Sequence, residues 1–427
     1  MSTRSNRILR RLVIVLGTIV ALIVAIGALP LFLWATARPL HPEPQNVPSA
    51  VLSEPSPQWA AAVGRARQMV RAVLSEQNLP GLSVAVGVGG DLVWAEGFGW
   101  ADVERRAPVT PETRFRMGTA STALTAAAVG VLLEKDRVKL DEEIQAYVPQ
   151  FPKKPWPVTL RQLMAQESGV GIQAKDDWRL SSERCERAAH ALPLFADGPL
   201  LFQPGTQVRQ SPHGWVLVSA AVEAVADWPF LSFMRDQVFR PLGMGDTGAE
   251  SPKEENPEHI GEDAEDPPPF RAIHDVILEP WRVLTGTQGE SAARESTRPA
   301  TYYVPQFGPH PVYQYALHVS SPRNLSCYAG SMAFFSTPSD LVRFELGLNG
   351  GRLLRPATVQ SLEAFGRTAG GYDGELPFST RFDMRLRPKV MSVVTVRERG
   401  IVVAAMSNST SADTSAVTRK VADAFAK

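Results

Sequence analysis

A long apolar run near the start of the chain constrains its architecture most strongly. Residues 12–35 are almost wholly apolar, and Arg4, Arg7, Arg10 and Arg11 precede them. A helix rises about 1.5 Å per residue, so this run is long enough to cross a hydrocarbon core of about 30 Å. Arginines on the near side keep that end in the cytoplasm. We therefore expect a membrane-spanning signal anchor, with residues 1–11 as a cytoplasmic stub.

The same run admits a second interpretation, a cleavable signal peptide. Ala35, Thr36 and Ala37 have the small-x-small pattern of a cleavage site. The run is longer than the roughly 7–15 residues of a usual signal core, which favours an uncleaved, single-pass anchor in the cytoplasmic membrane. Under either interpretation the body of the protein lies in the periplasm or outside the cell.

The rest of the chain has the composition of a packed globular body. Hydrophobic residues make up 44% of the sequence and the formal net charge is zero, so no nucleic-acid partner is expected. Residues 36–57 are proline-rich without an apolar period, which predicts a stiff linker. Cys185 and Cys327 lack metal-ligand spacing, and a disulfide and two buried thiols both remain open. The seven histidines are dispersed, and neither a metal nor a cofactor is expected.

Hydrophobic periodicity predicts the main helices and strands. Apolar residues at helical spacing predict a helix over 59–77, and two apolar runs around Gly89, Gly90 and Asp91 predict a hairpin of 81–88 with 92–99. The same reasoning predicts further helices at 126–135, 176–191, 216–225 and 414–425, and strands at 390–396 and 401–406.

Residues 113–125 form a small-residue turn that opens onto an alanine-rich helix. A hydroxyl on the first turn of a helix lies beside unpaired N–H groups and the positive end of the helix dipole. The run Phe115-Arg116-Met117-Gly118-Thr119-Ala120-Ser121-Thr122 resembles the nucleophile segment of the serine β-lactamase and penicillin-binding protein superfamily, in its class C β-lactamase and esterase branch. That family reads Phe-Arg-Ile-Gly-Ser-x-Ser-Lys, so Thr119 replaces the serine and Thr122 replaces the lysine.

The resemblance extends along most of the chain from about residue 59. It implies a mixed α/β fold, with an antiparallel sheet flanked by helices in one domain over 58–427. The sheet is expected from 58–118 and 322–427, with a mostly helical region and an insertion over 119–321; residues 252–321 fit no motif. Family-like segments lie at 97–102, 108–113, 140–144, 158–169, 204–206, 239–244 and 327–344.

The first motif has lost its base. An acylating hydrolase needs a nucleophile, a group that takes its proton and N–H donors for the oxyanion. Thr119 keeps a hydroxyl that its β-methyl crowds, and Thr122 cannot accept a proton at neutral pH. None of the nine lysines has Ser or Thr three positions earlier, so the motif is absent rather than displaced. Ser121 is a second candidate nucleophile, and a helix N-cap is the alternative role for Thr119.

The second and third motifs are altered too. After Pro204-Gly205-Thr206, the family's Tyr-x-Asn is replaced by Gln210, Ser211 and Pro212. The adjacent His213 is a candidate base, with a surface histidine as the alternative. The best match to the family's Lys/His-Thr/Ser-Gly is Tyr372, Asp373 and Gly374, where a carboxylate would repel an anionic substrate. The register Arg367-Thr368-Ala369-Gly370 is the second choice.

Two functions fit this pattern. The first is a membrane-anchored, catalytically degenerate member of the family that acts as a binding or regulatory module of the cell envelope, with a small-molecule or peptide ligand in the family groove. The alternative is an active hydrolase of esters, amides or cell-wall peptides that uses Thr119 or Ser121 with a non-standard base. The candidates for that base are His213, Tyr372 and Asp373. The sequence favours the first, and it names no protein partner.

Overall fold

The centre of the structure is an antiparallel sheet that both ends of the chain build. The computed structural model describes residues 17–18, 37–171, 179–249, 299–304, 315, 317–319, 324–368, 391–396, 400–409 and 411–426. In the sheet, β2 (Gly81–Val88) and β3 (Asp91–Asp102) form a hairpin, and β11 (Ile401–Ser407) and β10 (Met391–Val396) continue it beyond β2. The strand order is β1-β3-β2-β11-β10, with β1 (Ser49–Val51) on one edge and β4 (Ala107–Pro108) also paired to β3.

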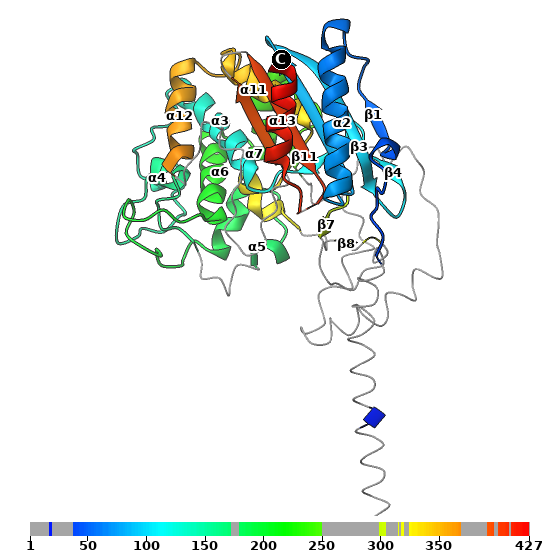
Figure 1. Cartoon of the computed structure of the whole chain (residues 1–427). Coiled ribbons are helices and arrows are strands. Elements are labelled where there is room, and N and C mark those ends of the chain that lie inside the picture. Colours follow the sequence, from blue (N-terminus) through cyan, green and yellow to red (C-terminus); the bar gives the residue numbers. More distant parts are fainter. Residues whose placement is uncertain are drawn as a thin grey trace, which may run out of the picture.

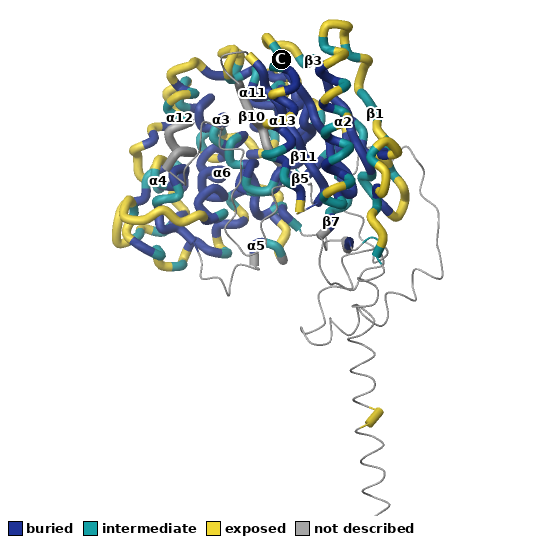
Figure 2. Tube along the Cα trace, in the orientation of Figure 1, coloured by how far each residue is buried: buried dark blue, intermediate teal, exposed yellow. Residues whose placement is uncertain are grey.

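Helices cover both faces of this sheet (Figure 1). Because side chains alternate along a strand, Val84 and Val86 pack under α2 (Ala60–Glu76) and α13 (Thr414–Ala426), whereas Ala85 faces the opposite core. That second face packs against α11 (Pro338–Asn349). Figure 2 shows the central strands buried throughout, which explains why β2 and β11 read as continuous apolar runs.

A helical region lies beyond α11 and holds the predicted site. Its centre is α3 (Ser121–Glu134), which is apolar around most of its circumference, as a helix enclosed by others must be. A short sheet runs beside its start, in the order β5 (Phe115–Arg116), β9 (Phe334–Ser336) and β6 (Gly248–Ala249). Separately, β7 (Tyr303–Val304) pairs with β8 (His318–Val319). The helical segments of this region are α4 (Leu160–Met164), α5 (Arg179–Ser182), α6 (Pro212–Ala226), α7 (Phe230–Met234) and α12 (Pro356–Thr368), with the shorter segments η4 (Ile144–Ala146), η6 (Ala188–Leu194), η7 (Arg235–Phe239), η8 (Arg240–Leu242) and η11 (Ser326–Ser331).

The mixed α/β fold with an antiparallel sheet confirms the prediction in its main elements. The helix predicted over 176–191 is wrong: within that range α5 spans Arg179–Ser182, residues 183–187 are not helical, and a separate 3-10 segment, η6, begins at Ala188. The amide of Cys185 in the break donates to Ser326 Oγ of a distant segment, so it cannot also donate to the carbonyl four residues earlier that a continuous helix would give it. Most of the apolar run 12–35 and of the insertion 252–321, and all of residues 372–374, lie outside the described residues.

The proline-rich segment before α2, predicted as a stiff linker over 36–57, is bound to the domain. His41 and Val47 are buried, and β1 adds to the edge of the sheet, with Ala50 opposite Gly97. The unpaired edge of β3 supplies partners that the segment's own sequence does not reveal. Across the described part of the chain no single helix is long and apolar enough to span a bilayer; the pair Pro212–Ala226 and Phe230–Leu242, bent by 78°, meets the criteria of length and composition.

Candidate functional site

Thr119 lies on the turn that links the short sheet to α3. The Met117 amide donates to the carbonyl of Phe334 at 2.9 Å, and Gly118 follows with φ +56°, a left-handed conformation that suits glycine. Thr119 comes next, in the 3-10 turn η3 (Gly118–Ala120), and is half-buried. Its hydroxyl does not cap α3: the N-cap residue of that helix is Ala120, and no side chain forms a capping hydrogen bond there. Thr119 thus lies on the turn that enters α3, and the N-cap role proposed for it is wrong.

Ser121 lies inside the protein. It has no solvent-exposed surface, and its Oγ accepts a hydrogen bond from the Phe334 amide at 3.3 Å. The hydroxyl thus joins α3 to β9, because Phe334 is the first residue of that strand. A buried hydroxyl that already serves a backbone donor is poorly placed to attack a substrate from solvent.

Thr122 occupies the position of the family's lysine. Its Oγ1 donates to the Thr119 carbonyl at 2.8 Å, a local bond within the first turn of the helix. Through the part of the chain that the structure describes, no hydrogen bond connects the Thr119 or Ser121 hydroxyl to a titratable side chain. The amine of Lys154 is bound elsewhere, since its Nζ donates to the carbonyls of Ala196 and Gly198.

The segment η11 packs directly behind α3. The carbonyl of Gly330 accepts from Thr125 Oγ1 at 2.8 Å, and its amide donates to Ser219 Oγ of α6 at 3.1 Å. A Cβ on Gly330 would lie 2.1 Å from Thr125 Oγ1 and 2.6 Å from Cζ of Phe230. Only glycine lets the backbone approach both helices so closely, so η11 holds α3 and α6 in register.

The second motif forms a buried pair of its own at the start of α6. Ser211 Oγ lies 3.2 Å from Nδ1 of His213, and the ring of Phe195 meets the imidazole edge-on at 4.9 Å between centroids. Both Ser211 and His213 are buried, so the alternative of a surface histidine is wrong. Gln210 is exposed, and Pro212 is at the first helical position. The structure therefore pairs His213 with Ser211 rather than with Thr119 or Ser121.

Burial makes His213 a weak base. Desolvation lowers its pKa from 6.5 to about 4, so the imidazole is neutral at pH 7. Between pH 6.5 and 4 the unfolded chain binds a proton that the folded chain excludes, so stability falls as the pH falls. We expect up to about 3 kcal/mol of the unfolding free energy to be lost over this window, since one pKa unit corresponds to about 1.4 kcal/mol.

This pH dependence is measured by urea unfolding of the wild type and of His213→Asn between pH 7 and 4. The variant is expected to show a shallower loss, whereas His190→Asn, at an exposed position, is expected to follow the wild type. An NMR titration that places the pKa of His213 near 6.5 would contradict this account.

The third motif lies outside the described residues at Tyr372, Asp373 and Gly374. In its second register, Arg367 and Thr368 end the helix α12, which does not fit a motif carried on a strand. Sequence reasoning also missed Tyr302, whose hydroxyl donates to the carbonyl of Arg116 at 2.9 Å, three residues before Thr119. Tyr302 falls in a stretch without a recognisable motif, so only the fold places it beside the first motif.

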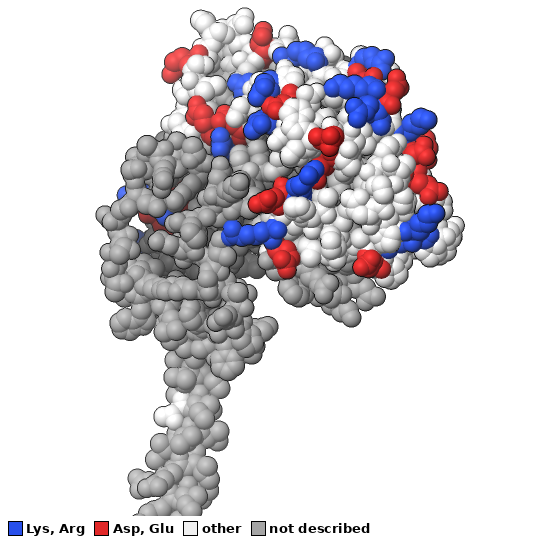
Figure 3. All heavy atoms as spheres, turned by 180° about the vertical axis from the view of Figure 1, so that it is seen from behind, with Lys and Arg blue, Asp and Glu red and all other residues white. Residues whose placement is uncertain are grey.

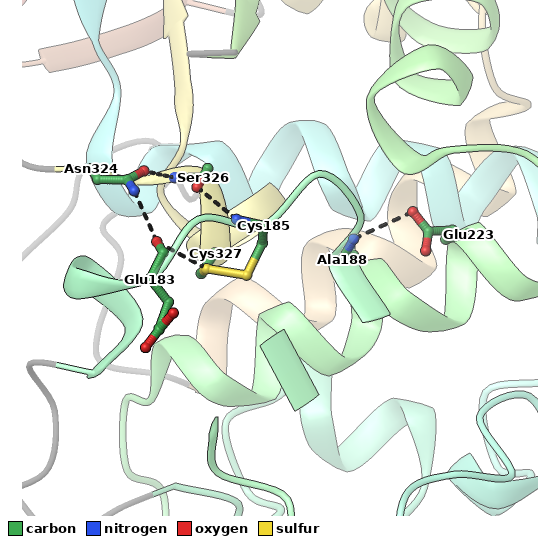
Figure 4. The surroundings of a disulfide bond; sticks show 7 residues. All are labelled: Glu183, Cys185, Ala188, Glu223, Asn324, Ser326 and Cys327. Carbon is green, nitrogen blue, oxygen red and sulfur yellow. Dashed lines mark hydrogen bonds between the residues drawn. A yellow bond between two sulfur atoms is a disulfide. The ribbon is translucent and has the colours of Figure 1, made fainter. Parts of the chain in front are cut away.

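A disulfide between Cys185 and Cys327 closes the helical region onto η11 (Figure 4). Around it, the Cys185 amide donates to Ser326 Oγ at 3.0 Å, and Nδ2 of Asn324 donates to the Glu183 carbonyl at 2.8 Å. This settles the open choice between a disulfide and two thiols. Because η11 also contacts α3 through Gly330, the crosslink supports the back of the candidate site.

The carboxylate of Glu223 is buried close to this disulfide. Its oxygens accept from the amides of Ala188 and Phe230 at 3.3 and 3.1 Å, and from Nε of Arg187 at 3.1 Å. Ala188 begins η6 and Phe230 begins α7, so one carboxylate stabilises the amino ends of two helical segments.

The sheet, the helical region and a hydroxyl at the turn into α3 define a protein with the architecture of an acylating serine hydrolase. A profile of the family described as Beta-lactamase matches residues 66–426. The chain therefore belongs to the beta-lactamase family, within the β-lactamase-like serine hydrolase superfamily.

Individual relatives are similar at a distance. The human serine beta-lactamase-like protein LACTB, mitochondrial, is 28% identical over 254 residues, which cover 44% of this chain and 46% of the relative. The chain thus spans less than half the length of this curated relative. Among solved structures, EstCE1, a hydrolase with promiscuous acyltransferase activity, has a TM-score of 0.60 at 17% identity and covers 86% of this chain and 99% of its own. The D-amino acid amidase from Ochrobactrum anthropi SV3 has a TM-score of 0.58 at 18% identity, covering 86% and 98%.

Proposed function

We propose that this protein is a membrane-anchored, catalytically silent member of its family that serves as a binding or regulatory module of the cell envelope. The observation that carries the proposal is the hydrogen bond from Thr122 to the Thr119 carbonyl. In the position where the family has an amine that takes a proton, this chain has a hydroxyl that is already donating to its own backbone. Nucleophilic attack needs such a base, because an alcohol is a weak nucleophile at its free pKa.

The second motif supports the same proposal. His213 is the one titratable candidate in that segment, and its lowered pKa leaves it a weak base at neutral pH. Its imidazole is directed to Ser211, so a Ser211–His213 pair is the specific observation that favours the alternative of an active hydrolase with altered machinery. That alternative needs Ser211, which is buried, to become accessible to a substrate.

The disulfide supports a location in the envelope, and the charge distribution supports the kind of ligand proposed. Disulfides persist in oxidising compartments such as the periplasm and the outside of the cell, in agreement with an anchor at 12–35 that leaves the body outside the cytoplasm. On the face drawn in Figure 3, positive and negative side chains are interspersed, and the formal net charge is zero. This pattern supports a small-molecule or peptide ligand over a polyanion.

Hydrolysis assays on the full chain test the proposal. With a p-nitrophenyl ester and a chromogenic cephalosporin, the wild type is expected to be no faster than Thr119→Ala. The variant should fold normally, because Thr119 is only half-buried and its side chain makes no hydrogen bond to any residue that the structure describes. A tenfold or greater fall in the rate of Thr119→Ala, with an unchanged circular dichroism spectrum, would show that Thr119 catalyses hydrolysis.

A further inference from the structure

The path of the chain into the domain fixes where an anchor can be attached. From residue 37 onward, Leu40 is the first described residue that is hydrogen-bonded to the body: its amide donates to Oδ1 of Asn78 at 2.8 Å. His41 follows and is 4% exposed, with Nε2 lying 3.3 Å from the Pro80 carbonyl. The His41 carbonyl accepts from Ser75 Oγ at 2.7 Å. Three contacts within two residues attach the incoming chain firmly at one end of the domain.

The attachment continues into the sheet, so the segment cannot act as a long tether. Val47 is 2% exposed and β1 pairs with β3 over three residues. With Leu40 bound, only residues 36–39 remain between the predicted span and the domain. Five Cα–Cα steps reach at most about 18 Å when fully extended. Leu40 therefore lies within about 18 Å of the end of the span.

The end of the domain around Leu40 has the residues that favour a membrane interface. Leu40, Trp100 and Tyr315 are partly buried and pack against a small cluster of Val103, Tyr303 and Leu317. Nδ2 of Asn78 donates to the Tyr315 carbonyl at 2.7 Å, which ties this cluster to the entry point of the chain. Tryptophan and tyrosine are enriched where lipid headgroups meet water.

We infer that the domain sits upright on the bilayer in a fixed orientation, with the end formed by Leu40, Asn78, Trp100 and Tyr315 facing the lipid. The inference rests on the proposed membrane anchor. The strand β2 starts at Gly81, beside this end, and runs to Val88. At about 3.3 Å per residue, the hairpin turn before Asp91 lies roughly 25 Å farther from the membrane than the entry point.

Energy transfer from single labels to the membrane tests this orientation. The two native cysteines are disulfide-bonded, so one introduced cysteine can be labelled selectively. Glu76→Cys places a donor fluorophore on an exposed residue at the end of α2 near His41, and Asp91→Cys places one at the exposed hairpin turn. The full chain is reconstituted in phosphatidylcholine vesicles that contain a rhodamine-headgroup lipid as acceptor. We expect several-fold faster energy transfer from position 76 than from position 91.

A longer connection provides the matched control. Twenty Gly/Ser residues inserted between Pro39 and Leu40 leave the contacts of Leu40 and His41 in place and add a flexible coil of about 25 Å root-mean-square length. The difference between positions 76 and 91 is expected to shrink in this variant. Equal transfer from both positions in the native-length protein overturns the inference.

Washing the vesicles with alkaline carbonate separates this failure from failure of the anchor. Protein that stays with the membrane but shows equal transfer retains its anchor and lacks the fixed orientation. Protein that the wash releases contradicts the anchor of the proposed function, and the inference falls with it.

Discussion

Replacing both Cys185 and Cys327 by serine is expected to lower the free energy of unfolding by about 2–5 kcal/mol. The disulfide joins residues 142 positions apart, so it removes a large amount of conformational entropy from the unfolded chain. It also ties η11 to the segment before η6, next to the hydrogen bonds of Ser326 and Asn324. Loss of the crosslink frees η11 from one of its supports.

Urea unfolding of the full chain, followed by tryptophan fluorescence, measures this effect. The double variant avoids the free thiol that a single substitution would leave. A thiol assay on the denatured, unreduced wild type is expected to find no reactive cysteine. Two titratable thiols in that assay, or a double variant as stable as the wild type, would contradict the prediction.

Glu223→Ala is expected to cost about 3 kcal/mol. The side chain is 2% exposed, and its removal leaves the amides of Ala188 and Phe230 without their acceptor inside the protein. Each unsatisfied buried donor costs about 1–3 kcal/mol. Arg187 adds less to the loss, because its side chain is 48% exposed and can turn to water.

Two comparison variants separate burial from charge. Glu223→Gln keeps one acceptor oxygen and is expected to lose about half as much stability. Asp141→Ala breaks an ion pair with Arg161 in which both side chains are well exposed, and should cost less than about 1 kcal/mol. If Asp141→Ala and Glu223→Ala were equally destabilising in chemical unfolding, the role given to the buried carboxylate would be wrong.

The sequence predicted the fold well where periodicity and turn chemistry act locally. The hairpin of β2 and β3 followed from two apolar runs around Gly89 and Gly90, and both glycines adopt positive φ in the structure. The helix α2 spans Ala60–Glu76, within one residue of the range that helical spacing indicated. Such elements depend on neighbours in sequence, so a single chain reveals them.

The site was less accessible because its residues depend on contacts between distant segments. Ser121 is buried where its hydroxyl meets the amide of Phe334, more than two hundred positions away, and nothing near Ser121 in the sequence signals this contact. The pairing of His213 with Ser211 was within reach, since they lie two residues apart at the start of a helix, but its burial under Phe195 was not. The docking of β1 likewise depends on the free edge of β3.

Intact mass after exposure to a fluorophosphonate and, separately, to a penicillin tests the central claim most directly. The full chain, purified in detergent and shown to be folded by circular dichroism, is compared with an active serine β-lactamase treated in parallel. Among the described residues no titratable side chain is hydrogen-bonded to the Thr119 hydroxyl, and Ser121 is buried, so we predict no mass shift for this protein while the active enzyme is labelled. A single covalent adduct that maps to Thr119, Ser121 or Ser211 would establish an activated hydroxyl and contradict a catalytically silent protein.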